Sequence, residues 1–507
     1  MGEQAEAGVP TAWRWDRWLA LIVGCLGVVL AAVAHRDAAF LGDQNNYLGG
    51  AESLAAGKGY REAYVVGEPR CTIYPPLFSS YLSLGFRAGG PWPQCLEWVA
   101  AGQWLLSGAT GFLTYLVLRQ QGVASRWAVP WTVLFLSSGC WHLMVNGLFS
   151  ESLMQPLFLG LLAWLGRKGR QGVGYGLGVG ILLSAIYLTR SASTAIVGGA
   201  LLVTLLHFRR LGWWRVFAVG LPVMLAVLGW RLWTQGAGMT YASSFVEVVR
   251  DGLGIPGYVR LIGRNVLSVA TGWDVLGAVC PMITRGIYHP LLAGTGATLG
   301  LRVLLGVLGG AGMFFVLVGI WQSRKQSDPW VAGIISLYLI QNILWWYWLG
   351  DRGMLILLPL FVIWAHRGLR TVATHWMSLR ALRRGVAGAL AVGLLLNLFL
   401  AVRTGKATAR TVERVEIEET AAWVREHVGT QDVLVASSDI PLPHFTHAAG
   451  RQVVGVAKSQ IAVVPGVPPT HAVVRTQPNR YMPQPEFLGE TLFTSAQGTF
   501  AVRRVTR

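Results

Sequence analysis

Long apolar stretches alternate with short polar and basic segments along most of the sequence. A membrane core about 30 Å thick needs roughly 20 apolar residues in a helix. Eleven windows of about that length are present, near 17–34, 98–118, 127–147, 152–166, 173–189, 192–208, 213–233, 299–321, 330–349, 353–366 and 386–402. The pattern predicts a polytopic α-helical membrane protein with about 11 transmembrane helices.

The pattern changes after residue 402, where charged residues become frequent. The segment 413–428 has the period of an amphipathic helix, and β-like runs follow at 432–437, 451–456, 470–476 and 498–505. About 100 residues are enough for one small domain. The sequence therefore predicts a membrane domain over 1–402 and a small soluble α/β domain over 403–507.

Arg and Lys residues collect in every second loop between the apolar windows. Such loops stay in the cytoplasm, so an odd number of spans places the N-terminus inside and the C-terminal domain on the periplasmic or extracellular side of the cytoplasmic membrane. The exterior loops are then 35–97 and 234–298. Apolar and basic residues at helical spacing predict amphipathic helices on the outer surface in the second of these loops.

Composition supports a membrane protein, because 53% of the residues are hydrophobic, 13% are charged and 23 are tryptophans. The net charge of +18 is accounted for largely by the basic cytoplasmic loops, so it does not require a nucleic-acid partner. A second interpretation of the start also stays open, since "VLAAVAHRD" has the form of a signal-peptide cleavage site. The sequence also leaves undecided whether Cys71 and Cys95 form a disulfide in the first exterior loop, where oxidation is permitted.

The first exterior loop contains "DQNNYLGGAESLAAGKGY" at 43–60. Asp43 and Tyr47 are four residues apart and share one face of a short helix, which Gly57 and Gly59 are expected to end. The spacing alone favours another interpretation, in which Asp43 caps a surface helix and Tyr47 lies in the headgroup region. A second apolar segment, 77–86, is too short to cross a membrane and is expected to lie along its surface.

Other charged residues lie at exterior turns on the same predicted side of the membrane, namely Glu151, Arg190, Asp351 and Arg352. Ionisable groups beside lipid are costly and usually functional, although each of these is also explicable as a charge at a helix end. Together they suit group transfer from an anionic lipid. A carboxylate takes a proton from the acceptor, and an arginine holds a phosphate with its planar fork.

The ordered motifs resemble the GT-C superfamily of integral membrane glycosyltransferases. The resemblance is to the branch with protein O-mannosyltransferases and lipid A aminoarabinose transferases, and it covers about residues 17–402. It rests on the sequence at 43–60 and on "YPPLFSSYLSLGF", "LFSESLMQPLFLGLLAWL", "GLGVGILLSAIYLTRSASTAI" and "DRGMLILLPLFVIWAHRGLR".

This resemblance implies a hexosyl- or pentosyltransferase that moves a sugar from a polyprenyl-phosphate donor to a lipid, glycan or protein acceptor among membrane lipids. It makes Asp43 the catalytic acid/base and Glu151 a second acid. The aminoarabinose transferases have a charged residue at the position of Tyr74, so identical donor contacts are not expected. The substrate-binding residues expected from the resemblance and from the shared side of the membrane are Tyr47, Tyr74, Arg190, Asp351 and Arg352.

No metal site is predicted, because His35, His142 and His289 have no ligand spacing. A divalent cation that bridges Asp43, Glu151 and a phosphate stays open, and no other cofactor is indicated. Two alternatives compete with the transferase. A transporter or flippase is expected to show inverted repeats or broken helices, which the sequence does not reveal, and a non-catalytic scaffold would use the C-terminal domain as a binding module.

Overall fold

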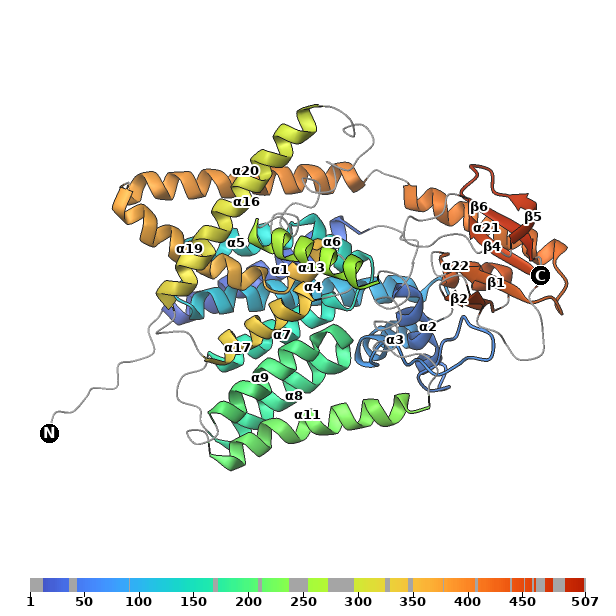
Figure 1. Ribbon diagram of the computed structural model, residues 1–507, viewed down its shortest axis with the longest axis horizontal. Coiled ribbons are helices and arrows are strands. Elements are labelled where there is room, and N and C mark those ends of the chain that lie inside the picture. The colour runs from blue at the N-terminus through green and yellow to red at the C-terminus, as the bar shows by residue number, and fades with distance from the viewer. Residues whose placement is uncertain are drawn as a thin grey trace.

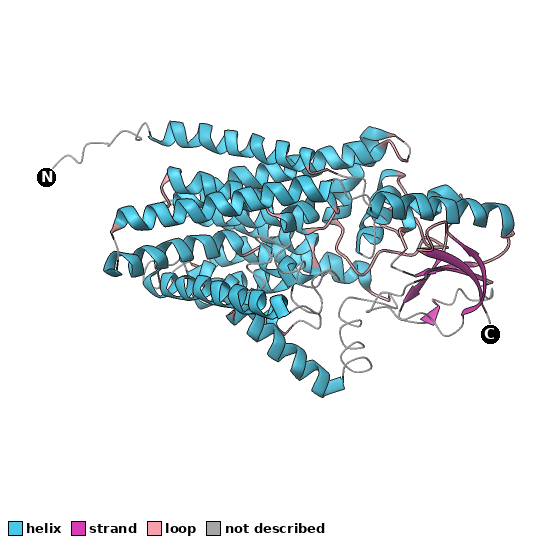
Figure 2. Ribbon diagram, turned by 90° about the horizontal axis from the view of Figure 1, so that it is seen from above, coloured by secondary structure: helices cyan, strands magenta, loops and turns pink. Residues whose placement is uncertain are grey.

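Helices make up most of the protein, and a small sheet lies at one end of the molecule (Figures 1 and 2). The computed structural model describes residues 12–35, 43–90, 92–166, 172–207, 212–236, 254–271, 296–323, 329–344, 350–376, 378–405, 409–437, 440–450, 452–457, 460–461, 470–476 and 488–505.

Each predicted apolar window contains helix within its described residues. The helices are α1 (Ala12–Val33), α4 (Cys95–Gln120), α5 (Ser125–Leu136), α6 (Gly139–Asn146), α7 (Glu151–Leu165), α8 (Val173–Thr189), α9 (Thr194–Leu206), α11 (Trp213–Thr234), α16 (Gly296–Ser323), α17 (Pro329–Ile343), α18 (Gly350–Leu355), α19 (Leu358–Trp376) and α20 (Leu379–Gly405). A 3-10 turn, η1 (Ser191–Ser193), joins α8 to α9.

The prediction of eleven membrane spans is not confirmed. Among the described residues, only α1 over Trp15–Val33 and α11 are long and apolar enough to cross a membrane, or three spans if α5 and α6 are counted as one. Several other apolar helices are shorter. For example, α7 has 15 residues, about 22 Å at 1.5 Å per residue, which is less than a membrane core.

The expectation of unbroken helices was wrong at 127–147. The structure has two helices there, α5 and α6, bent by 55° at their junction. Ser138 ends the first helix by capping the second, because its hydroxyl accepts from the backbone N–H of Trp141 at 3.2 Å. A serine at a cap competes with a continuous helix, and the apolar pattern does not reveal this.

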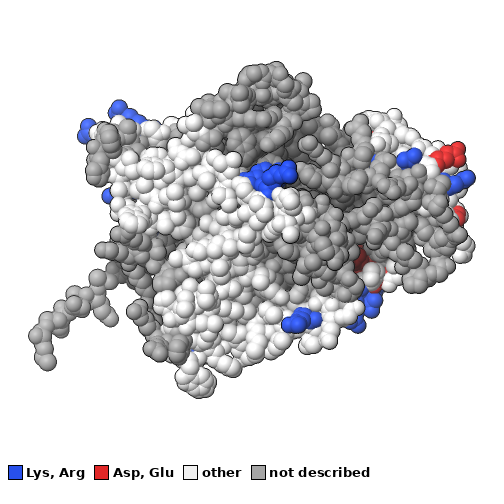
Figure 3. Space-filling view, viewed as in Figure 1, with Lys and Arg blue, Asp and Glu red and all other residues white. Residues whose placement is uncertain are grey.

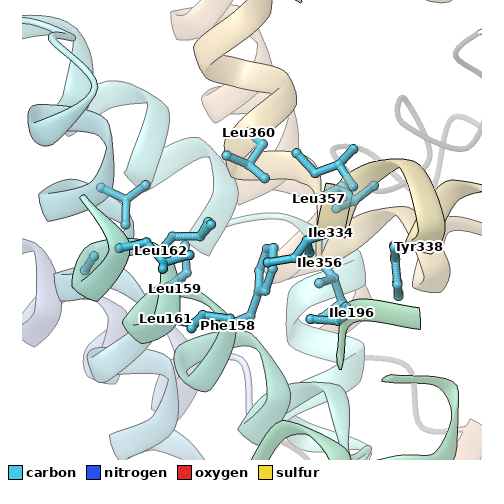
Figure 4. Close-up of a cluster of buried hydrophobic side chains, with 14 of the residues drawn as sticks. Phe158, Leu159, Leu161, Leu162, Ile196, Ile334, Tyr338, Ile356, Leu357 and Leu360 are labelled. Atoms are coloured by element: carbon cyan, nitrogen blue, oxygen red, sulfur yellow. The ribbon is translucent and has the colours of Figure 1, made fainter. Parts of the chain in front are cut away.

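The core of the helical part joins α7, α9, α17 and the segment that leads into α19. Figure 4 shows Phe158, Ile196, Ile334 and Leu357 turned toward a common centre. Helices α9 and α17 meet backbone to backbone, since a Cβ on Gly199 would lie 2.6 Å from the carbonyl oxygen of Gly333. Small residues permit such close approach between membrane helices.

The described outer surface of the helices is apolar. In the face drawn in Figure 3, charged residues are sparse over the helical part. Trp18 on α1 and Leu232 on α11 are 63% and 67% exposed. Large exposed apolar side chains on long helices are typical of contact with lipid.

The first loop forms two helices between the helical part and the sheet (Figure 1), namely α2 (Asp43–Ala55) and α3 (Leu77–Gly89). As predicted, Gly57 and Gly59 follow α2 with positive φ angles of 74° and 85°, which favour glycine. The disulfide between Cys71 and Cys95, which the sequence left undecided, is not formed. Both cysteines are free and buried. Of the second loop, the structure describes one helix, α13 (Gly254–Ala270).

The C-terminal part contains the predicted helix, α21 (Ala409–His427), and one six-stranded mixed sheet in the order β3-β2-β1-β4-β6-β5. The four predicted runs became β1, β2, β4 and β6, while β3, β5 and helix α22 were not predicted. The bounds are β1 (Leu434–Ser437), α22 (Leu442–Ala449), β2 (Val454–Ala457), β3 (Gln460–Ile461), β4 (His471–Arg475), β5 (Leu488–Thr494) and β6 (Phe500–Val505). The division into domains at 402 stays a prediction.

Candidate active site

Helix α2 presents the first predicted site residues. Asp43 is its first residue, and Tyr47 follows one turn later. The position of Asp43 is favourable, because carboxylates are stabilised at helix N-termini. The helix is polar yet buried, with Tyr47 1% exposed and Gln44 and Asn45 each 4% exposed. Buried polar groups need hydrogen-bond partners, so the partners of these side chains define the site.

Tyr74 bonds directly to Asp43. Its hydroxyl donates to Oδ1 of Asp43 at 2.5 Å, which is a short bond typical of a charged acceptor. The ring of Tyr74 also lies 4.9 Å from the ring of Tyr47. Tyr74 therefore contacts both predicted residues of α2 and fixes the orientation of the carboxylate.

Tyr47 joins α2 to the second predicted acid. Its hydroxyl donates to Oγ of Ser150 at 3.0 Å, and Ser150 in turn lies 3.5 Å from Oε2 of Glu151. Glu151 is the first residue of α7 and is 2% exposed. The Ser150 hydroxyl thus connects the two helices that carry the predicted acids.

Arg190 pairs with Glu151, through Nη1 and Oε1. Arg190 follows the last residue of α8, where a cation is favoured by the helix dipole. Its side chain is 21% exposed, while that of Glu151 is 2% exposed. This is a largely buried ion pair whose arginine faces the more open side.

The pKa of Tyr47 reflects this surrounding charge. Burial raises the pKa of the phenol, the carboxylate of Asp43 raises it further, and Arg190 lowers it in part. Glu151 adds a smaller upward contribution. All three ionisable groups therefore act on one phenol, and the structure brings Asp43, Tyr47, Tyr74, Glu151 and Arg190 into one cluster.

Three uncharged side chains that the sequence did not single out hold this cluster together. One is Ser150, described above. Gln44 donates through Nε2 to the carbonyl oxygen of Gly147, and Ser191 donates to the carbonyl oxygen of Ile73 at 3.2 Å. These residues have no distinguishing spacing, so the sequence carried no signal for them.

Asp351 and Arg352 lie on α18, and the structure does not describe their side chains. The backbone that follows them contacts α7 and α17. Nε2 of Gln155, one turn after Glu151, lies 3.5 Å from the carbonyl oxygen of Ile356, and the Tyr338 hydroxyl donates to the carbonyl oxygen of Gly353 at 3.1 Å. Their predicted role in substrate binding stays a prediction.

The described residues contain no group of three or more His, Cys, Asp and Glu side chains placed to hold a metal ion. His142 is buried within α6, His35 packs edge-on against Trp104 at 5.4 Å, and His289 lies outside the described residues. A divalent cation that bridges Asp43, Glu151 and a phosphate stays a prediction.

No protein-family model matches the sequence, and no curated protein matches it. Solved structures match its fold. The structure of ArnT from Cupriavidus metallidurans bound to undecaprenyl phosphate superposes with a TM-score of 0.54 at 14% identity, over 98% of each chain. The apo structure of the same protein gives a TM-score of 0.53 at 15% identity, over 97% of this chain and 98% of that one. ArnT is a lipid A aminoarabinose transferase with the GT-C fold, so the fold that the motifs predicted is confirmed.

Proposed function

We propose that this protein is a membrane glycosyltransferase that transfers a sugar from a polyprenyl-phosphate donor to a lipid, glycan or protein acceptor. The observation that carries the proposal is the convergence of Asp43, Glu151 and Arg190 around Tyr47, from three separate segments of the chain. The shared fold with an ArnT structure bound to undecaprenyl phosphate supports the class of donor.

Asp43 is proposed as the acid/base. Its carboxylate takes the proton of the acceptor hydroxyl or amine while the acceptor atom bonds to the anomeric carbon. The bond from that carbon to the phosphate oxygen breaks, and the polyprenyl phosphate leaves with the electron pair. Tyr74 holds the carboxylate by its 2.5 Å hydrogen bond, so the base keeps one orientation during the transfer.

Arg190 is proposed to bind the phosphate of the donor. A guanidinium carries five N–H donors, enough to bond Glu151 and a phosphate together. The pairing with Glu151 holds the arginine in place before the donor arrives. Glu151, the second acidic residue of the site, is proposed to keep the guanidinium oriented. Asp351 and Arg352 are proposed to contact the donor from α18.

The apolar helices are proposed to hold the prenyl chain next to the cluster, in the cytoplasmic membrane. In this arrangement the N-terminus is cytoplasmic, and the cluster and the C-terminal domain lie on the periplasmic or extracellular side. The exposed apolar surfaces of α1 and α11 agree with contact to lipid.

One observation favours a transporter, namely the bent pair of α5 and α6. The described contacts of this pair are those of tightly packed, buried helices. Nε1 of Trp141, which is 0% exposed, donates to the hydroxyl of Ser107 at 2.9 Å. A fixed indole at the bend argues against an open transport path, and the assay below separates the two functions.

The test is sugar release from a labelled polyprenyl-phosphate donor by purified protein, with Asp43→Asn beside the wild type. Loss of a general base reduces the rate by about 10²- to 10⁴-fold. Glu97→Gln is the matched control, since Glu97 is an exposed carboxylate in the first turn of α4, and it is expected to keep full activity.

Equal consumption of donor by the wild type and Asp43→Asn would refute the assignment of Asp43. Movement of the labelled lipid across vesicles without sugar release would identify a transporter instead. Binding of a partner by the C-terminal domain, with neither release nor transport, would identify a scaffold.

A further inference from the structure

Helix α2 contacts different parts of the chain with two opposite faces. Asp43 and Tyr47 share one face, which contacts Tyr74 and Ser150. Asn45 and Glu52 are seven residues apart, which is close to two turns, and they lie on the opposite face. That second face meets the C-terminal part of the chain, as Figure 1 shows for α2 and α22.

Asn45 makes the contact nearest to Asp43. Its Nδ2 donates to the carbonyl oxygen of Ile440 at 3.0 Å. Asn45 is 4% exposed and Ile440 is 0% exposed, so water does not replace this bond when it is lost. A buried carbonyl without its donor is costly, and the bond therefore fixes the first turn of α2.

Glu52 makes a second contact on the same face. Its Oε2 lies 3.1 Å from Nε2 of His447 on α22. The ring of His447 stacks on Trp92, with centroids 4.8 Å apart and planes inclined by 7°. This contact fixes the last turn of α2, so the helix is held at both ends.

Backbone and core contacts make the attachment rigid. The N–H of Val66 donates to the carbonyl oxygen of Val453 at 3.0 Å, and the N–H of Val453 donates to that of Tyr64 at 3.1 Å. Leu48 of α2 and Phe445 of α22 belong to one buried apolar cluster and are both 0% exposed. The first loop and the C-terminal part therefore share a core.

We infer that Asn45 is a positioning residue, through which the C-terminal part of the chain holds Asp43 against Tyr74. Glu52 acts in the same way from the far end of α2. The catalytic consequence of this inference rests on the proposed function, whereas the structural consequence, a more mobile α2 when either contact is lost, does not.

The structural consequence is tested by hydrogen–deuterium exchange in the full-length protein. Amide exchange within 43–55 is expected to be at least about tenfold faster in Asn45→Asp and Glu52→Gln than in the wild type, because local opening becomes easier. Asn45→Asp keeps the size of the side chain and removes the donor. Asn46→Ala is the matched control, since Asn46 is a neighbouring, only half-buried asparagine, and its exchange is expected to equal that of the wild type.

The catalytic consequence is tested by kinetics on the same variants. In Asn45→Asp, kcat is expected to fall by roughly ten- to a hundredfold with the donor KM unchanged, since a displaced base slows the chemical step. Unchanged exchange in 43–55 in both Asn45→Asp and Glu52→Gln overturns the inference. Faster exchange with unchanged kcat overturns the positioning role. A wild type without transferase activity refutes the proposed function, while the exchange result still decides whether the C-terminal part holds α2.

Discussion

Replacing Arg190 by glutamine removes the cation that faces Glu151. The glutamate side chain is 2% exposed, so its charge is left in a site that water barely reaches. Breaking a buried pair in this way costs about 3–5 kcal/mol. At an unfolding entropy of about 2.1 cal/mol/K per residue, a chain of 507 residues is expected to lose about 1 °C in Tm for each kcal/mol, or roughly 3–5 °C in total.

The assay is thermal unfolding in detergent, with two further variants. Glu151→Gln combined with Arg190→Gln removes both charges and is expected to recover most of the lost Tm. Sugar transfer is expected to be lost in both variants, because each lacks the guanidinium proposed to bind the phosphate. Arg414→Gln breaks a more exposed pair with Glu418 on α21, at 3.0 Å, and is expected to cost at most about 0.5 kcal/mol. A double variant as unstable as Arg190→Gln, or a Tm of Arg190→Gln equal to that of the wild type, would refute the reasoning.

Three further predictions concern separate parts of the molecule. Tyr74→Phe removes a hydrogen bond to a charged acceptor, which is worth about 1.5–3 kcal/mol. Steady-state kinetics is expected to show kcat at least about tenfold lower, and full activity would contradict the role of Tyr74 in orienting Asp43. Burial raises the pKa of Glu62 from 4.5 to about 7, so the folded protein binds this proton more tightly and loses stability as the pH rises from about 4.5 through about 7; the Tm of Glu62→Gln is expected to lack this decline. Gly199→Ala places a Cβ 2.6 Å from the carbonyl oxygen of Gly333 and is expected to cost about 1–3 kcal/mol, whereas Gly198→Ala, whose nearest neighbour lies at 4.0 Å, is expected to keep the wild-type Tm.

The sequence predicted the positions of the helices well, because apolar windows of membrane length leave little choice of structure. It predicted α2 together with its end at Gly57, since the spacing of Asp43 and Tyr47 and the following glycines act locally. It failed where one polar contact or a very short strand decides the structure. The bend at Ser138 depends on a single hydrogen bond from the N–H of Trp141, and strand β3 (Gln460–Ile461) has two residues and depends on pairing with β2.

The cluster itself was predicted in part. The charged members, Asp43, Glu151 and Arg190, stand out because ionisable groups beside lipid are costly and usually functional. Their partners do not stand out. Ser150 bonds to Tyr47 across 103 positions of the sequence, and Ser191 to Ile73 across 118, and a serine in a turn is ordinary in any sequence. Such contacts can be identified only in the folded structure, where the segments lie together.

The motif at 43–47 explains why a buried helix of low apolar content is stable. Asp43 bonds to Tyr74, Gln44 to Gly147, Asn45 to Ile440 and Tyr47 to Ser150, so four of its five side chains bond to three different segments. Each bond contributes only about 1 kcal/mol in net terms, but the partners surround the helix and restrict its rotation and translation. A carboxylate that must meet a substrate in one geometry requires this kind of support, and a surface cap does not. The arrangement of the partners therefore favours the catalytic interpretation of Asp43 over the alternative of a simple helix cap.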